Sequence, residues 1–132
     1  IKSAVDYFIK KGITLEKISL VGASFGANLV LQLQSQHPEI KSSVLLSPGL
    51  DYRGIAAEKG VKNLNQDQSI FFAAGGENDA YSTETANKLY ALSRSENKRL
   101  KIFKNAGHGT TVFKEEPSFM DELVLWLKSI YF

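Results

Sequence analysis

The chain has 132 residues, a length typical of one domain, with 43% hydrophobic residues, 23% charged residues and a formal net charge of +2. These values are ordinary for a globular protein, and the lysines are scattered, so specific binding of nucleic acid or of a membrane surface is not indicated. The chain contains no cysteine, which excludes a disulfide framework and a thiolate metal site and favours a cytoplasmic location. No apolar run approaches the length of a membrane-spanning helix.

The first residues form a helical pattern, in which Ile1, Val5, Phe8 and Ile9 recur at helical spacing and Gly12 acts as a stop signal. The chain therefore begins inside a helix, and it begins at Ile1 rather than at a methionine. This start indicates a piece of a longer protein. A signal peptide upstream of Ile1 would overturn the expected cytoplasmic location.

Short apolar runs alternate with helical patterns along the rest of the chain. The predicted strands cover residues 18–21, 43–46, 70–74 and 100–103. The predicted helices cover 25–36, a short stretch through Ala56 and Ala57, a segment capped by Ser82, and a last helix with Pro117 in its first turn. Because the strand runs are too apolar to have a solvated face, we expect an α/β fold, a mostly parallel sheet of about four strands with helices on both faces.

A serine stands between two glycines at the point where the first predicted strand passes into a helix, in the sequence Gly22-Ala23-Ser24-Phe25-Gly26. Glycine has no Cβ, so the chain can turn sharply there and still pack the helix against the strand. The Ser24 hydroxyl would then be exposed beyond the carboxyl end of a strand, where parallel sheets bind their ligands. This is the Gly-x-Ser-x-Gly pattern of a nucleophile elbow, and its strand–turn–helix context strengthens it. A phosphate-binding loop would need a Lys-Ser/Thr pair, which is absent.

A serine hydroxyl needs a base to become a nucleophile, and the chain offers two histidines. His37 ends a predicted helix just before a proline, which is typical of a surface histidine. His108 lies between Gly107 and Gly109, just past the fourth predicted strand, where flanking glycines let a loop bring the imidazole close to another loop. His108 is therefore the candidate base.

The base in turn needs a carboxylate that fixes its tautomer and stabilises the imidazolium. Asp79 follows the third predicted strand and is the favoured candidate. Asp51, after the second strand, is the next candidate, and Glu77 is the third. For the two that are not used, turn formation or helix capping is the expected role.

The order Ser24, Asp79, His108, with each residue after its own strand, is the order of the α/β-hydrolases. The chain resembles the C-terminal half of that fold, and specifically small serine esterases of the dienelactone-hydrolase-like or prolyl-oligopeptidase-like type. The resemblance runs over essentially the whole chain and is carried by residues 22–26, 76–79 and 107–109. A serine nucleophile, where dienelactone hydrolases usually have cysteine, favours the esterase or peptidase members.

The resemblance implies a serine hydrolase that cleaves a carboxylic ester or related acyl bond through an acyl-enzyme intermediate. The backbone N–H of Phe25 would be one oxyanion-hole donor, and the second would come from upstream of Ile1. The substrate would be a small acyl compound, and no metal or organic cofactor is implied. A serine peptidase, an acyltransferase and a non-catalytic binding module with the same fold remain alternatives.

The family sheet has about eight strands, so the resemblance also implies that residues 1–132 form a single partial domain without its N-terminal strands. The strand Ile18–Val21 would then be an edge with unpaired N–H and C=O groups. Such an edge can pair with another chain, so we expect self-association through it.

Overall fold

A four-stranded parallel sheet forms the centre of the molecule, in a computed structural model that describes all residues from Ile1 to Phe132. The strand order is β1-β2-β5-β6, so sheet neighbours follow one another along the chain and all four carboxyl ends lie on one edge of the sheet. The strands are β1 (Ser19–Ala23), β2 (Ser42–Leu46), β5 (Ser69–Ala74) and β6 (Lys98–Ile102). The sheet therefore confirms the predicted number and direction of strands.

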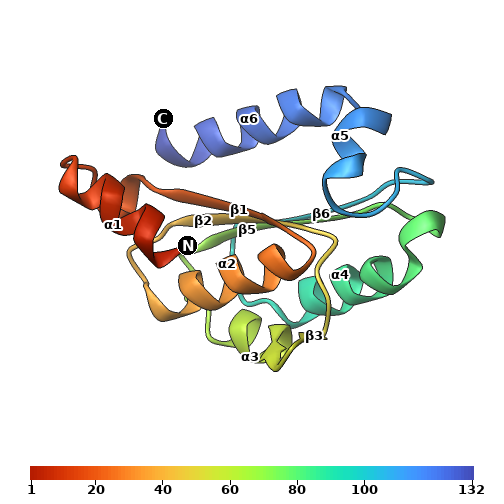
Figure 1. Cartoon of the computed structure of the whole chain (residues 1–132), viewed down its shortest axis with the longest axis horizontal. Helices are drawn as coiled ribbons and strands as arrows, with labels where there is room; N and C mark the ends of the chain where they lie inside the picture. Colours follow the sequence, from red (N-terminus) through yellow and green to blue (C-terminus); the bar gives the residue numbers. More distant parts are fainter.

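Helices cover both faces of this sheet (Figure 1), which confirms the predicted α/β class. One face carries α2 (Phe25–Gln36), α3 (Ala57–Lys62) and α4 (Ala80–Leu92), and the other carries α5 (Val112–Glu115) and α6 (Ser118–Tyr131). The first helix, α1 (Lys2–Lys10), lies at one end of the molecule. None of these helices combines the length and the hydropathy needed to cross a bilayer.

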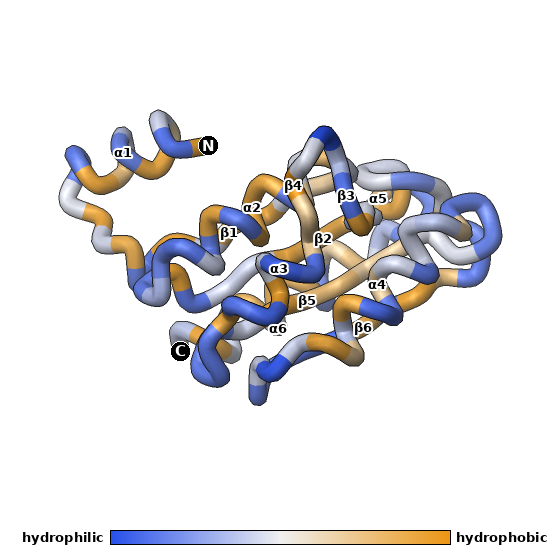
Figure 2. Tube along the Cα trace, turned by 90° about the horizontal axis from the view of Figure 1, so that it is seen from below, coloured by the Kyte–Doolittle hydropathy of each residue, from blue (hydrophilic) through white to orange (hydrophobic).

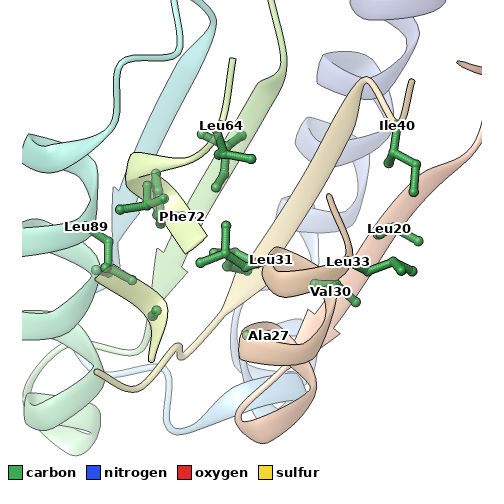
Figure 3. Close-up of a cluster of buried hydrophobic side chains, with 14 of the residues drawn as sticks. Leu20, Ala27, Val30, Leu31, Leu33, Ile40, Leu64, Phe72 and Leu89 are labelled. Carbon is green, nitrogen blue, oxygen red and sulfur yellow. The ribbon is translucent and has the colours of Figure 1, made fainter. Parts of the chain in front are cut away.

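The core has two layers because alternate residues of a strand point to opposite faces of the sheet. Leu45 and Phe72 belong to the cluster beneath α2, α3 and α4, whereas Val44 and Phe71 belong to the cluster beneath α5 and α6. Figure 3 shows side chains of the first cluster gathered between the helices and the sheet. Every residue of β2 and β5 is buried as a result, and the two central strands form a rigid base for the loops that follow them.

The two outer strands differ from the central pair, because each has a sheet neighbour on one side only. Val21 in β1 is 52% exposed, and no residue of β6 is fully buried. The expectation that every strand run lacks a solvated face is therefore confirmed for β2 and β5 and is wrong for β1 and β6. The predicted edge at Ile18–Val21 is confirmed, since β1 ends the sheet.

Two local predictions need correction. Ser82 does not cap α4, because the helix begins at Ala80, and the Ser82 side chain is buried inside it with no hydrogen-bond partner. The short helix predicted through Ala56 and Ala57 begins only at Ala57, since Ala56 belongs to β4 (Ile55–Ala56), which pairs with β3 (Asp51–Tyr52) as a small antiparallel hairpin. Figure 2 shows the hydrophilic tip of this hairpin projecting from the sheet.

Candidate functional site

Ser24 forms the turn between β1 and α2 and has an unusual backbone conformation. Its φ is 54° and its ψ is −125°, in a region that non-glycine residues rarely adopt and that carries a cost of about 1–3 kcal/mol. Its N–H donates to the Leu46 carbonyl at 2.8 Å, which continues the β1–β2 ladder one residue beyond the strand. The turn therefore places a half-buried serine side chain at the carboxyl edge of the sheet.

The sharpness of this turn depends on Gly22. A Cβ on Gly22 would lie 2.3 Å from the Gly26 carbonyl oxygen, so only glycine lets the start of α2 approach the end of β1 this closely. Gly26 has open space where its Cβ would be, so no steric reason requires glycine there. Of the two glycines expected to permit the turn, the structure thus requires Gly22 for close packing.

Phe25 presents a backbone N–H next to Ser24. It is the first residue of α2, and the first N–H groups of an α-helix have no acceptor within the helix. The helix has 12 residues, and its aligned peptide dipoles place partial positive charge at this end. A developing negative charge beside Ser24 would be stabilised at this position.

Asp79 and His108 are in direct contact. Asp79 ends the 3-10 turn η2 (Glu77–Asp79) after β5, and His108 lies after β6. The His108 Nδ1 and the Asp79 Oδ1 are 2.7 Å apart, a hydrogen bond that the imidazole donates when Nδ1 carries the proton. The Asp79 side chain is 5% exposed and that of His108 is 46% exposed, so the carboxylate is enclosed while the imidazole reaches solvent. This arrangement leaves Nε2 as the free nitrogen of the imidazole.

Ser47, which sequence reasoning missed, lies on the other side of the Asp79 carboxylate. Its hydroxyl donates to the Asp79 Oδ2 at 2.5 Å, and the Gly75 N–H approaches the same oxygen at 3.3 Å. The Ser47 oxygen also accepts the Gly109 N–H at 2.7 Å. The sequence feature that could have identified Ser47 is its place directly after a buried strand, at the carboxyl edge of the sheet where the other candidate residues lie.

Backbone contacts join the loop after β5 to the loop after β6. The Ala106 N–H donates to the Gly75 carbonyl at 2.7 Å, and the Glu77 N–H donates to the Lys104 carbonyl at 3.0 Å. A Cβ on Gly75 would lie 1.8 Å from the Gly107 carbonyl oxygen, so the two loops touch without an intervening side chain. This contact fixes the position of the Asp79 loop relative to the His108 loop.

The remaining candidates lie elsewhere or act differently. The Asp51 Oδ1 accepts the Gly54 N–H at 2.7 Å and so stabilises the turn of the β3–β4 hairpin, which is the turn-forming role expected for an unused acid. Glu77 is exposed and its side chain makes no hydrogen bond. His37 follows α2 at the end opposite Ser24, about 18 Å away along a helix of this length.

The structure brings Asp79 and His108 together and places their loops beside Ser24, but no hydrogen bond joins Ser24 to His108. A Cβ on Gly109 would lie 3.6 Å from the Ala23 Cβ, so the residues next to His108 and Ser24 are in contact distance. In structures without substrate, such hydrogen bonds are often long and form only when substrate binds. No group of three or more histidine, aspartate or glutamate side chains is placed to hold a metal ion.

Comparison with known proteins gives a likeness in structure and none in sequence. No protein-family model matches the chain, and no curated protein matches it in sequence. Among solved structures, the chain is similar to the esterase domain of a Rhodothermus marinus protein, with 16% sequence identity and a TM-score of 0.65 over 86% of this chain. The chain spans 59% of the length of that domain. At this identity the likeness supports the α/β fold found here.

Proposed function

We propose that this protein is a serine hydrolase that cleaves a carboxylic ester or a related acyl bond. Ser24 is the nucleophile, His108 the general base and Asp79 the residue that orients and stabilises the imidazolium. The N–H of Phe25 stabilises the oxyanion. The observation that carries the proposal is the 2.7 Å contact between His108 Nδ1 and the enclosed carboxylate of Asp79, beside a serine with strained backbone geometry.

The proposed reaction has two steps. The Ser24 Oγ attacks the acyl carbon while its proton passes to the His108 Nε2, and the tetrahedral intermediate expels the alcohol, which takes that proton. Water then attacks the acyl-serine and gives a proton to the His108 Nε2. The second tetrahedral intermediate releases the acid product as His108 returns that proton to the Ser24 Oγ. Proton transfer and charge stabilisation by these residues account for both steps, so the proposal includes no cofactor.

The alternatives use the same residues. An amide substrate would make the protein a peptidase, and an alcohol in place of water would make it an acyltransferase. The esterase domain similar in fold favours an ester substrate. A non-catalytic binding module would keep the fold without the chemistry.

Acyl-transfer sites generally aim two N–H groups at the oxyanion, and loss of one costs about a hundredfold to a thousandfold in turnover. The Phe25 N–H, at the first position of α2, is the donor assigned here.

A fluorophosphonate probe tests the proposal even when turnover is slow, because it reacts once with an activated serine. We expect one probe per chain, located at Ser24 by peptide mass spectrometry, and a small activated ester to be hydrolysed in parallel. Heat-denatured protein is the control for non-specific reaction. Labelling at another serine would contradict the proposed nucleophile. No labelling above the denatured control would favour the binding module.

A further inference from the structure

We propose that Ser47 is a positioning residue, whose single hydroxyl holds both the acid and the base of the site in their working orientation. This inference rests on the proposed function for its catalytic meaning, but the geometry that carries it is independent of Ser24. Ser47 is 2% exposed and makes its two side-chain hydrogen bonds to Asp79 and to the residue that follows His108.

The direction of both hydrogen bonds is fixed by the chemistry of the partners. The Gly109 N–H can only donate, so the Ser47 oxygen accepts it at 2.7 Å. The ionised carboxylate of Asp79 can only accept, so the hydroxyl proton points to Oδ2 at 2.5 Å. One orientation of the hydroxyl therefore satisfies both partners, and neither bond can reverse.

This orientation determines which carboxylate oxygen is left for the imidazole. Oδ2 receives the Ser47 hydroxyl and the Gly75 N–H, so Oδ1 is the oxygen that faces His108. A rotation of the Asp79 carboxylate would break the bonds to Oδ2 together with the bond to His108. The Gly109 bond acts from the other side, because it holds the backbone directly after His108.

The backbone conformation of Ser47 does not favour a serine at this position. Its φ is 50°, a value that favours glycine, and its N–H already donates to the Ala73 carbonyl at 2.8 Å. A serine in such a conformation persists when its surroundings over-determine it. Replacement by glycine would relieve the backbone and remove the CH2OH side chain with its two hydrogen bonds, which makes Ser47→Gly the sharpest variant.

Ser43 provides a matched control. It lies in β2, the strand that Ser47 follows, and is fully buried, and its hydroxyl donates to the Gln34 Oε1 at 2.5 Å at the amino end of the sheet. We expect Ser47→Gly to lower kcat about tenfold to a hundredfold with KM unchanged, because a displaced catalytic group slows the chemical step more than binding. Ser43→Ala should keep kcat while losing stability.

Proton NMR gives a second readout that does not depend on turnover. The wild-type protein should show a low-field signal from the His108 Nδ1 proton, which Ser47→Gly shifts or broadens and Ser43→Ala leaves in place. If Ser47→Gly does not fold, the wild-type protein still decides: a slowly exchanging Ser47 hydroxyl proton that cross-relaxes with the Gly109 N–H supports the inference, and a rapidly exchanging one overturns it.

The outcomes separate this inference from the proposed function. If Ser24→Ala is inactive while Ser47→Gly keeps both kcat and the His108 signal, the positioning role is wrong and the hydrolase proposal stands. If Ser24→Ala hydrolyses esters as fast as wild type, the hydrolase proposal is wrong. The NMR comparison then still shows whether Ser47 orders the contact between Asp79 and His108.

Discussion

Ser24 and Ser47 occupy equivalent places on neighbouring strands. Each directly follows its strand, each has a positive φ near 50°, and each donates its backbone N–H at 2.8 Å to a carbonyl of the next strand in the sheet. Their side chains nevertheless differ in every respect that matters for chemistry. The Ser24 hydroxyl is half buried and has no hydrogen-bond partner, whereas the Ser47 hydroxyl is buried and has two.

The difference lies in where the two strands stand in the sheet. β2 is central, so the loops after β5 and β6 cover its end and enclose Ser47. β1 is the edge strand, so Ser24 has such a loop on one side only. The same backbone turn thus leaves the Ser24 hydroxyl without a hydrogen-bond partner at the edge of the sheet and holds the Ser47 hydroxyl in two hydrogen bonds at its centre. We expect Ser24 to react with the substrate and Ser47 to position Asp79 and His108.

The largest expected effect is the loss of the available hydroxyl. Ser24→Ala should abolish fluorophosphonate labelling and reduce ester hydrolysis to the background rate, because removal of such a nucleophile costs about a millionfold in a well-studied serine protease. Ester hydrolysis at fixed protein concentration measures it, with circular dichroism to show that the variant is folded. Near-full turnover in the folded variant would remove Ser24 from the mechanism.

The next effect concerns the Asp79 carboxylate, which contacts both Ser47 and His108. Asp79→Asn should slow turnover by about ten-thousandfold, the loss seen for this change in a serine protease, because an amide favours the wrong imidazole tautomer. Asp51→Asn is the matched control, and it should change turnover little since Asp51 only stabilises a hairpin turn. The opposite ranking of the two kcat values would move the acid to Asp51.

A smaller effect is expected on stability, where the two serines should respond differently to replacement by glycine. Ser24→Gly should be neutral or stabilise the protein by up to about 2 kcal/mol, because glycine relieves the strained turn without losing a side-chain bond. Ser47→Gly should destabilise it by about 1 kcal/mol, because the loss of buried hydrogen bonds outweighs the same relief. Urea denaturation gives both free energies of unfolding. Equal changes for the two variants would mean that the Ser47 hydroxyl bonds contribute nothing to stability.

The smallest expected effect concerns the edge itself. β6 presents Lys98, Arg99 and Lys101, and such charges discourage pairing with another chain, whereas β1 exposes Val21. We expect weak self-association through β1. Val21→Lys should shift the molecular mass measured by light scattering toward the monomer. Ile102→Lys on the opposite edge is the control and should leave it unchanged. A wild-type protein that is monomeric at high concentration would contradict this expectation.

Much of this architecture could be predicted because it depends on neighbouring residues. Short apolar runs marked all four sheet strands, three of them followed by glycine or proline, and the pattern over 25–36 matched α2 residue for residue. The contact between Asp79 and His108 was also predictable, since both residues follow strands of one parallel sheet. Chain order and the common carboxyl edge were sufficient to bring them together.

The rest depended on contacts between distant segments. Ser47 stands 32 residues from Asp79 and 62 from Gly109, and its Ser-Pro-Gly context is that of an ordinary turn. Ser82 carried a typical capping signal, but the η2 turn adds three residues that lead into α4, so Ser82 falls inside the helix. The β3–β4 hairpin is held partly by Asn28, whose Nδ2 donates to the Gly49 and Ile55 carbonyls, which no local pattern reveals.

The backbone contact between Gly75 and Gly107 has a consequence for the motions of the protein. Because the loops after β5 and β6 share hydrogen bonds and touch without side chains, we expect them to open together. Native-state hydrogen exchange should therefore show the amides of Glu77 and Ala106 exchanging with one common opening free energy, as members of a single cooperative unit. The backbone segments that carry Asp79 and His108 would then separate only when that whole unit unfolds.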